Sequence, residues 1–365
     1  MSADDLSRKI ARRIAAEGPL SISAFMAMAL HDPEDGYYAA RNPIGAEGDF
    51  ITAPEISQVF GELIGVWCVL MWQRLGQPDP IILAELGPGR GVLIGDLLRA
   101  AAAHPAFRSA LRLHLVEASR TLRAEQEKRL AQLRPVWVSQ FEDLPDGPML
   151  LVANEFLDAL PIRQFVRGAV YWSERMVALD GHNRFVFVDG PENPLTSLLV
   201  PAGLRDCVGQ DTVVETCSAA LGLAAALGAR FVRHPGAALF IDYGYYPSAP
   251  GPTLRALRRH RAVSALAAPG TADLSAHVDF MAFAEAAQAG GGATYGPVPQ
   301  RVLLAALGVS QRAAVLRARA TPSQRRALDD GVRRLLDPGQ MGTLFQATAL
   351  VSPGLPPPPG FEAGL

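Results

Sequence analysis

The stretch Glu85-Leu-Gly-Pro-Gly-Arg-Gly91 follows the apolar run 81–84 and precedes residues 92–102, whose apolar side chains recur at helical spacing. A buried strand, a glycine-rich turn and a helix in this order suit a nucleotide-type ligand. Glycines let the ligand approach the backbone, and the first helical turn offers free amides. We therefore expect an α/β fold whose ligand site includes Gly87, Gly89 and Gly91. The alternative is that the glycines form only a tight strand-to-helix turn.

The segments around this turn alternate between strand and helix. Apolar runs predict strands, and helical spacing predicts helices between them. This alternation indicates a parallel, Rossmann-like sheet with helices on both faces. The predicted strands are 81–86, 111–117, 135–139 and 149–153, and the predicted helices are 92–102 and 119–133.

The N-terminal region is predicted to be a helical extension. Leu6, Ile10 and Ile14 recur every four residues up to Gly18-Pro19, and a second helix is expected after Ser23. Its remaining segments are an ordered loop at 33–55 and a helix at 60–75.

The chain after Pro161 changes to strand-like patterning, which predicts an inserted β ribbon with Asp180-Gly181 as a hairpin-turn signal. Two further helices are expected before the last strand. The proline-rich tail from Ser352 is predicted to be extended and mobile. The predicted strands are 163–167, 170–178, 184–188, 237–242 and 344–351, and the predicted helices include 211–231 and 276–289.

The composition excludes several classes of protein. The chain has 365 residues, 49% of them apolar and 19% charged, as in soluble globular proteins. Its formal net charge of −2 gives no reason to expect nucleic acid. Cys68, Cys207 and Cys217 match no metal or disulfide spacing, so no metal is expected. We find neither a membrane-spanning run nor a secretory signal, and we expect a reducing, cytoplasmic setting in a bacterium.

Two features of the glycine turn favour S-adenosylmethionine over a dinucleotide. The spacing is GxGxG instead of GxGxxG, and Glu85 stands two residues before the first glycine. A carboxylate there can bind the amino group of a methyl donor, directly or through water, whereas it would repel a pyrophosphate. The expected cofactor is therefore S-adenosyl-L-methionine.

Three residues after the next strands are further candidates for donor binding. Glu117 ends a predicted strand, where a carboxylate can accept hydrogen bonds from both ribose hydroxyls, as it also does in NAD-binding folds. Phe141 can stack on adenine, and Asp143 can accept from its exocyclic amine. The alternative for this last pair is a core aromatic and a solvated turn acid.

The candidate acceptor site is Asn154-Glu-Phe-Leu-Asp-Ala-Leu-Pro161, at the carboxyl end of the fourth predicted strand. Methyl transfer requires alignment of nucleophile, methyl group and sulfur. Asn154, Glu155 and Asp158 are the predicted catalytic residues, and the two carboxylates suit a cationic acceptor such as an arginine guanidinium. In the alternative, Asn154 caps a helix and Asp158 is solvated.

Four motifs together resemble the MidA family. The resemblance runs from about Leu20 to Leu350 and implies a seven-stranded class I methyltransferase fold. The family's mitochondrial members are complex I assembly factors that act as protein arginine methyltransferases. The implied activity is symmetric dimethylation of an arginine on the 49-kDa-type subunit of complex I, or on the equivalent subunit of a bacterial NADH dehydrogenase. The motifs are Gly48-Asp-Phe-Ile-Thr-Ala-Pro-Glu-Ile-Ser57, Glu85-Leu-Gly-Pro-Gly-Arg-Gly91, Asn154-Glu-Phe-Leu-Asp-Ala-Leu-Pro161 and Ile241-Asp-Tyr-Gly-Tyr245.

The resemblance also implies roles for residues outside the donor turn. A loop bent at Gly45 and Gly48 would close over the donor, although a structural Ω-loop is the alternative. The residues implied to cover the donor are Thr52, Pro54 and Glu55, and those implied to line the acceptor side are Asp242, Tyr243, His277 and Asp279.

Three other functions stay open at this point: a small-molecule methyltransferase, an assembly chaperone that binds S-adenosylmethionine without turnover, and an NAD oxidoreductase. Either a monomer or a homodimer is compatible with the sequence. The expected regions are an N-terminal helical region with a donor-covering loop (1–75), a methyltransferase domain (76–351) with insertions at about 162–210 and 245–275, and the tail (352–365).

Overall fold

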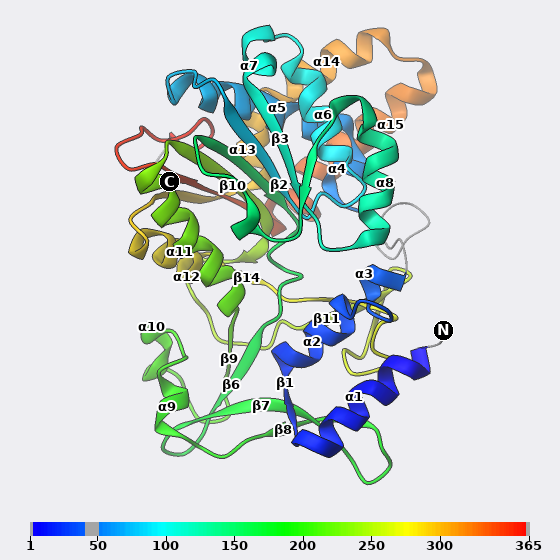
Figure 1. The fold of residues 1–365 in the computed structure, drawn as a ribbon, viewed down its shortest axis with the longest axis vertical. Coiled ribbons are helices and arrows are strands. Elements are labelled where there is room, and N and C mark those ends of the chain that lie inside the picture. Colours follow the sequence, from blue (N-terminus) through cyan, green and yellow to red (C-terminus); the bar gives the residue numbers. More distant parts are fainter. Residues whose placement is uncertain (1–2, 41–50, 363–365) are drawn as a thin grey trace. The chain divides into compact units, whose positions relative to one another are not determined.

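The computed structural model describes residues 3–40 and 51–362 of the chain (Figure 1). The chain divides into two compact units, each assembled from three segments. The accessory unit comprises residues 1–50, 157–222 and 245–283, and the sheet unit comprises residues 51–156, 223–244 and 284–365. The predicted hinge glycines Gly45 and Gly48 lie outside the described residues.

The sheet unit contributes seven strands to one sheet, the number that the family resemblance implies. Five neighbouring strands are parallel, from β10 through β5, β2 and β3 to β4, and β16 runs antiparallel to both β10 and β15. Every residue of β2 and β5 is buried, as expected for central strands covered on both faces. The strands follow in the order β15 (Ala293–Pro299), β16 (Phe345–Val351), β10 (Gly236–Tyr245), β5 (Met149–Asn154), β2 (Ile81–Leu86), β3 (Leu111–Val116) and β4 (Val136–Val138).

The helices of the sheet unit pack around this sheet (Figure 1). A large apolar core includes the fully buried side chains of Phe60 and Trp67 from α5. The helices are α4 (Ala53–Ile56), α5 (Gln58–Arg74), α6 (Val92–Ala101), α7 (Pro105–Ala110), α8 (Arg120–Leu130), α13 (Gln300–Ala306), α14 (Val309–Arg319), α15 (Pro322–Leu336) and α16 (Met341–Leu344), with short 3-10 turns at Ala131–Leu133 and Phe141–Asp143.

Helix α5 contacts two neighbouring helices, α6 through a glycine and α14 through a buried carboxylate. A Cβ atom at Gly61 would lie 2.6 Å from the Cβ of Asp96 on α6, so only glycine fits there. Glu62 is 1% exposed and accepts hydrogen bonds from both Nε (2.7 Å) and Nη2 (2.9 Å) of Arg312 on α14. The buried carboxylate is therefore compensated by a bidentate guanidinium.

The accessory unit combines N-terminal helices with small antiparallel sheets. The β ribbon predicted after Pro161 is present, and strand β1 joins it by pairing with β7. Helix α1 buries Leu6, Ile10 and Ile14, as their spacing predicts. The elements are α1 (Ala3–Glu17), β1 (Leu20–Ser21), α2 (Ile22–His31), α3 (Tyr37–Ala40), β6 (Arg163–Arg167), β7 (Trp172–Leu179), β8 (Phe185–Asp189), α9 (Pro194–Ser197), α10 (Ala202–Arg205), β9 (Val213–Thr216), β11 (Arg255–Arg258), β12 (Arg261–Val263), β13 (Asp273–Ser275) and β14 (Val278–Asp279).

Two helices carry the chain from the accessory unit into the sheet unit, and both begin later than predicted. Helix α11 (Ser218–Arg233) does not start at 211, because the buried β-branched pair Val213 and Val214 forms strand β9 against β6. Helix α12 (Phe280–Ala289) does not start at 276, because the carboxylate of Asp279 accepts from the Ala282 amide (3.0 Å) and caps the helix there.

Other predictions are corrected where local patterning is broken. Strand β15 was not predicted, because Gly296-Pro297 interrupts it and its register shifts between Tyr295 and Val298. Four helices, not two, lie between β10 and β16 after α12. The turn at Asp180 is longer than a two-residue hairpin: Asp180 N donates to Arg184 O (2.9 Å), and the left-handed residue is Asn183.

The proline-rich tail packs onto the sheet unit, which corrects the expectation of a mobile tail. Phe361 is 5% exposed and belongs to the main apolar core. Arg74 of α5 donates hydrogen bonds to the carbonyl of Pro357 and, at 2.9 Å, to the carboxylate of Glu362. Prolines prevent helix and sheet here, but they do not prevent the burial of an aromatic side chain. Within the described ranges, none of the helices has the length and apolar character needed to cross a membrane.

Candidate functional site

The glycine turn between β2 and α6 has the backbone that its sequence requires. Gly87, Gly89 and Gly91 all lie in the left-handed region, with φ of 59°, 53° and 73°. A Cβ at Gly87 would lie 2.8 Å from Cδ2 of Phe156, and one at Gly91 would lie 2.9 Å from Cδ1 of Leu130. All three glycines therefore have an unusual backbone, and at Gly87 and Gly91 close packing adds a second reason why a side chain would not fit.

Glu85 lies at the buried end of strand β2. It is 3% exposed, and burial raises the pKa of its carboxyl to about 8, with the Ile94 backbone hydrogen bond opposing this rise and nearby Glu117 adding to it. Its Oε2 atom is buried and has no hydrogen-bond partner within the described part of the chain. A carboxyl in this environment is suited to a cationic ligand group, whose charge would stabilise the ionised form of the acid.

Glu117, just beyond the end of β3, is held by neighbouring donors. Its Oε1 accepts from the Ser119 amide (2.7 Å) and its Oε2 from Nε2 of Gln126 (3.0 Å). Gln126 also donates to the carbonyl of Gly89 (2.7 Å) and accepts from the indole of Trp137 (2.9 Å). Gln126 thus connects the glycine turn to the predicted ribose-binding carboxylate, and sequence reasoning had missed it.

Phe141 and Asp143 lie together in the 3-10 turn after β4. Phe141 is half-buried and Asp143 is exposed, with its carboxylate accepting from Gln140 (3.4 Å). Their contact with adenine stays a prediction.

Glu155 has the most unusual backbone among the predicted catalytic residues. Its φ is 51°, a left-handed conformation that costs a non-glycine residue about 1–3 kcal/mol and is concentrated at functional sites. Its Oε1 accepts from the backbone N–H of Ala53 (2.9 Å) and from Nδ2 of Asn154 (2.9 Å). The carboxylate is therefore anchored to the first turn of α4, which carries the predicted donor-covering residues.

The segment after β5 is not the start of a helix, so the helix-cap alternative for Asn154 is wrong. Its turn is instead held by β10. The Glu155 amide donates to the carbonyl of Ile241 (2.9 Å), and the Phe156 amide donates to Oδ2 of Asp242 (3.1 Å). Asp242 is 1% exposed and also accepts from the Tyr243 amide (2.9 Å). Asp242 therefore fixes the candidate acceptor turn from the neighbouring strand.

The predicted donor-covering residues lie at the start of α4. Thr52 is the residue before its first turn, and Pro54 is buried inside that turn. Glu55 has a buried Oε1 atom 3.7 Å from Nη1 of Arg90, which belongs to the glycine turn. This ion pair connects helix α4 to the glycine turn, and the role of α4 in covering the donor stays a prediction.

The remaining candidates, Asp158, His277 and Asp279, belong to the accessory unit. Asp158 is buried, and its carbonyl accepts from the Ala276 amide (3.0 Å). Burial lowers the pKa of His277 and raises that of Asp279, whose Oδ1 also accepts from the Ser248 hydroxyl (2.8 Å).

Within the accessory unit, His277 and Asp279 line a cavity of about 40 Å³ together with Glu215 and Tyr245. The roles of these residues toward an acceptor stay predictions. In residues 3–40 and 51–362, no group of three or more acidic, histidine or cysteine side chains is arranged to hold a metal ion.

The residues of the glycine turn fit a bound methyl donor. Glu85 offers a buried carboxylate with an unpartnered oxygen, and Gly87 is exposed in a left-handed turn next to it. S-adenosylmethionine, when bound, supplies an electrophilic methyl group on its sulfonium. With the sheet order described above, these features define a class I, S-adenosylmethionine-dependent methyltransferase.

Comparison with known proteins agrees with this class. The family described as "Putative S-adenosyl-L-methionine-dependent methyltransferase" matches residues 63–298, and the chain belongs to this family. A Drosophila melanogaster relative named protein arginine methyltransferase NDUFAF7 homolog, mitochondrial, is 34% identical over an alignment of 376 positions, which covers 94% of this chain and 84% of the relative. The Danio rerio protein arginine methyltransferase NDUFAF7, mitochondrial, is 35% identical and covers 93% of this chain and 85% of its own. These relatives confirm the resemblance to MidA-type methyltransferases.

A solved structure supports both the fold and the cofactor. A Burkholderia thailandensis protein, determined bound to S-adenosyl-homocysteine, is 28% identical and superposes with a TM-score of 0.81 over 100% of this chain and 94% of its own. The predicted fold class and the predicted cofactor are confirmed.

Proposed function

We propose that this methyltransferase is a protein arginine N-methyltransferase. Its proposed substrate is a subunit of a bacterial NADH dehydrogenase, equivalent to the 49-kDa-type subunit of complex I. We further propose that the reaction takes place in the cytoplasm and supports assembly of that complex. The observation that carries the proposal is Glu155, a carboxylate held in a strained backbone conformation at the carboxyl end of a central strand. The names of the relatives support arginine as the acceptor.

Methyl transfer depends more on the alignment of the reacting groups than on acid–base catalysis. Transfer forms an N–C bond, breaks the C–S bond so that S-adenosyl-homocysteine leaves, and releases one N–H proton to solvent. A guanidinium nitrogen must therefore lie in line with the methyl group and the sulfur. A carboxylate can fix the guanidinium plane through paired N–H donors. Glu155 is suited to this because the Ala53 amide and the Asn154 side chain already hold its own position.

The test uses a substitution that removes the charge of Glu155 and keeps its hydrogen bonds. In Glu155→Gln the amide oxygen can still accept from Ala53 and Asn154. We expect methyl transfer to fall by about 100-fold while affinity for S-adenosyl-homocysteine stays within a few-fold. The matched control is Glu285→Gln, at an exposed position of α12, which should behave as wild type.

The assay incubates the full chain with labelled S-adenosylmethionine and the candidate subunit, followed by mass spectrometry of methyl-arginine. Label on an arginine supports the proposal. It is refuted if no arginine is labelled although the chain binds S-adenosyl-homocysteine. Assembly of the complex that survives Glu155→Ala without any methylation would instead favour a chaperone.

A further inference from the structure

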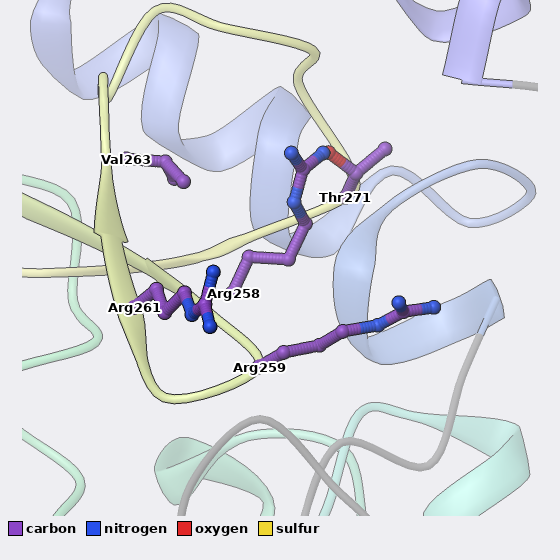
Figure 2. Close-up of a pocket in the computed structure, with 5 residues that line it drawn as sticks. All are labelled: Arg258, Arg259, Arg261, Val263 and Thr271. Carbon is purple, nitrogen blue, oxygen red and sulfur yellow. The ribbon is translucent and has the colours of Figure 1, made fainter.

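We propose that the β11–β12 hairpin of the accessory unit is a docking site for an acidic segment of the protein that this enzyme methylates. The site is a cavity of about 680 Å³, called here the arginine pocket (Figure 2). The inference rests on the proposed function only in taking the partner to be the protein substrate. The pocket is lined by Arg258, Arg259, Arg261, Val263 and Thr271.

The turn of the hairpin has an unfavourable backbone conformation. Arg258 pairs with Arg261 across the strands, so Arg259 and His260 are the two turn residues. Both are left-handed, with φ of 49° and 59°, in a turn where glycine, asparagine or aspartate is usual. Backbone strain of this kind is concentrated at functional sites, so the hairpin has features that stability alone does not explain.

The charges on the hairpin also oppose its stability. Arg258 and Arg261 lie directly opposite each other, and like charges in this position are destabilising. Arg258 donates to the Thr271 hydroxyl at 3.5 Å. Across the part of the chain that the structure describes, neither Arg258 nor Arg261 forms an ion pair with a carboxylate. The exposed hairpin thus carries several arginines close together, and their positive charge would attract an anionic partner.

The directions of the side chains select the kind of anion. In Figure 2 the guanidinium groups of Arg258 and Arg259 point in different directions, and that of Arg261 lies apart from both. Groups spread in this way match several carboxylates along a chain better than one compact phosphate. Among the described residues that line the pocket none is aromatic, so this lining offers no stacking platform for single-stranded nucleic acid. An acidic peptide segment fits these observations best.

The experiment measures binding of a fluorescein-labelled glutamate-rich peptide to the full chain by anisotropy, and the KM of the candidate subunit in the methylation assay. In the triple variant Arg258→Ser, Arg259→Ser, Arg261→Ser we expect peptide affinity to fall roughly ten-fold and KM to rise by a similar factor, because surface ion pairs with the peptide are lost. The corresponding triple lysine variant should keep most of the affinity. Added salt should weaken the wild type more than the serine variant.

Two controls separate docking from a general loss of charge or of folding. Replacing Arg319, Arg326 and Arg334 with serine removes the same charge from exposed positions of α14 and α15, and peptide affinity should stay within two-fold. Affinity for S-adenosyl-homocysteine should be equal in all variants, which shows that the sheet unit is intact.

The outcomes distinguish this inference from the proposed function. Equal peptide binding by the serine variant and the wild type overturns the docking site. Binding of inorganic phosphate or a single-stranded oligonucleotide in preference to the peptide also overturns it. Loss of peptide binding in the serine variant, without any arginine label in the subunit, supports the docking site and refutes the proposed function.

Discussion

Replacing Glu85 with glutamine should make the ligand-free protein more stable at neutral and mildly alkaline pH. Burial raises the pKa of this carboxyl from its ordinary value of 4.5 to about 8. Between these two values the folded protein holds a proton that the unfolded chain has lost. The stability that the protonated Glu85 carboxyl contributes is therefore complete below pH 4.5. It is lost as the pH rises through 8, and the free energy of unfolding falls by about 1.4 kcal/mol per pH unit between the two pKa values.

The assay is urea denaturation of wild type and Glu85→Gln, both without ligand, at about pH 6 and about pH 7.5. The free energy of unfolding of the wild type should fall relative to the variant by about 2 kcal/mol over this interval. All other titratable groups are present in both proteins, so their effect cancels in the difference. Parallel pH profiles would refute the reasoning.

The same substitution should weaken donor binding. Glutamine cannot supply the negative charge that a cationic amino group would compensate, and hydrogen bonds to charged groups contribute about 1.5–3 kcal/mol. We expect affinity for S-adenosyl-homocysteine to fall by about ten-fold or more in calorimetry. A variant that binds as tightly as wild type would place the ligand's amino group elsewhere.

Three other substitutions test contacts described above, each by denaturation. Gly87→Ala should cost about 2–3 kcal/mol of stability, from its left-handed backbone and the contact with the Phe156 ring. The same substitution should cost less in a chain that already carries Phe156→Ala, and an equal cost in both backgrounds would exclude that contact. Arg312→Ala should cost about 2 kcal/mol of stability, a value that allows for the partial exposure of Arg312, because it leaves Glu62 buried with a weaker partner. Adding Glu62→Gln should restore most of this loss. No restoration would contradict the argument. Phe361→Ala should cost about 2–4 kcal/mol, and an unchanged Tm would mean that the tail is not packed.

The central fold could be predicted because its signals are local. The strand at 81–86 and the ribbon strand at 163–167 were predicted with the bounds that the structure has. Strands β9 and β15 were not predicted. The first is only four residues long and precedes a helix-like run, and the second is interrupted by Gly296-Pro297.

The candidate site was partly predictable for the same reason. The glycine turn can be recognised from spacing, whereas the role of Gln126 depends on Glu117, Gly89 and Trp137 meeting in space. The left-handed backbone of Glu155 has no sequence signal, because nothing in a carboxylate side chain predicts a positive φ.

The interleaving of the two units has a consequence for how the protein is made. The strands β2 to β5 of the large sheet leave the ribosome early, but β10, β15 and β16 follow only after most of the accessory unit has been synthesised. Until β10 is synthesised, the sheet is therefore incomplete and β5 is an unpaired edge strand. Edge strands of this kind can pair with other chains and aggregate. Premature termination before Phe345 would leave this sheet without the strand that closes β10, so truncated products should be substrates for chaperones and proteases, not partially active enzymes.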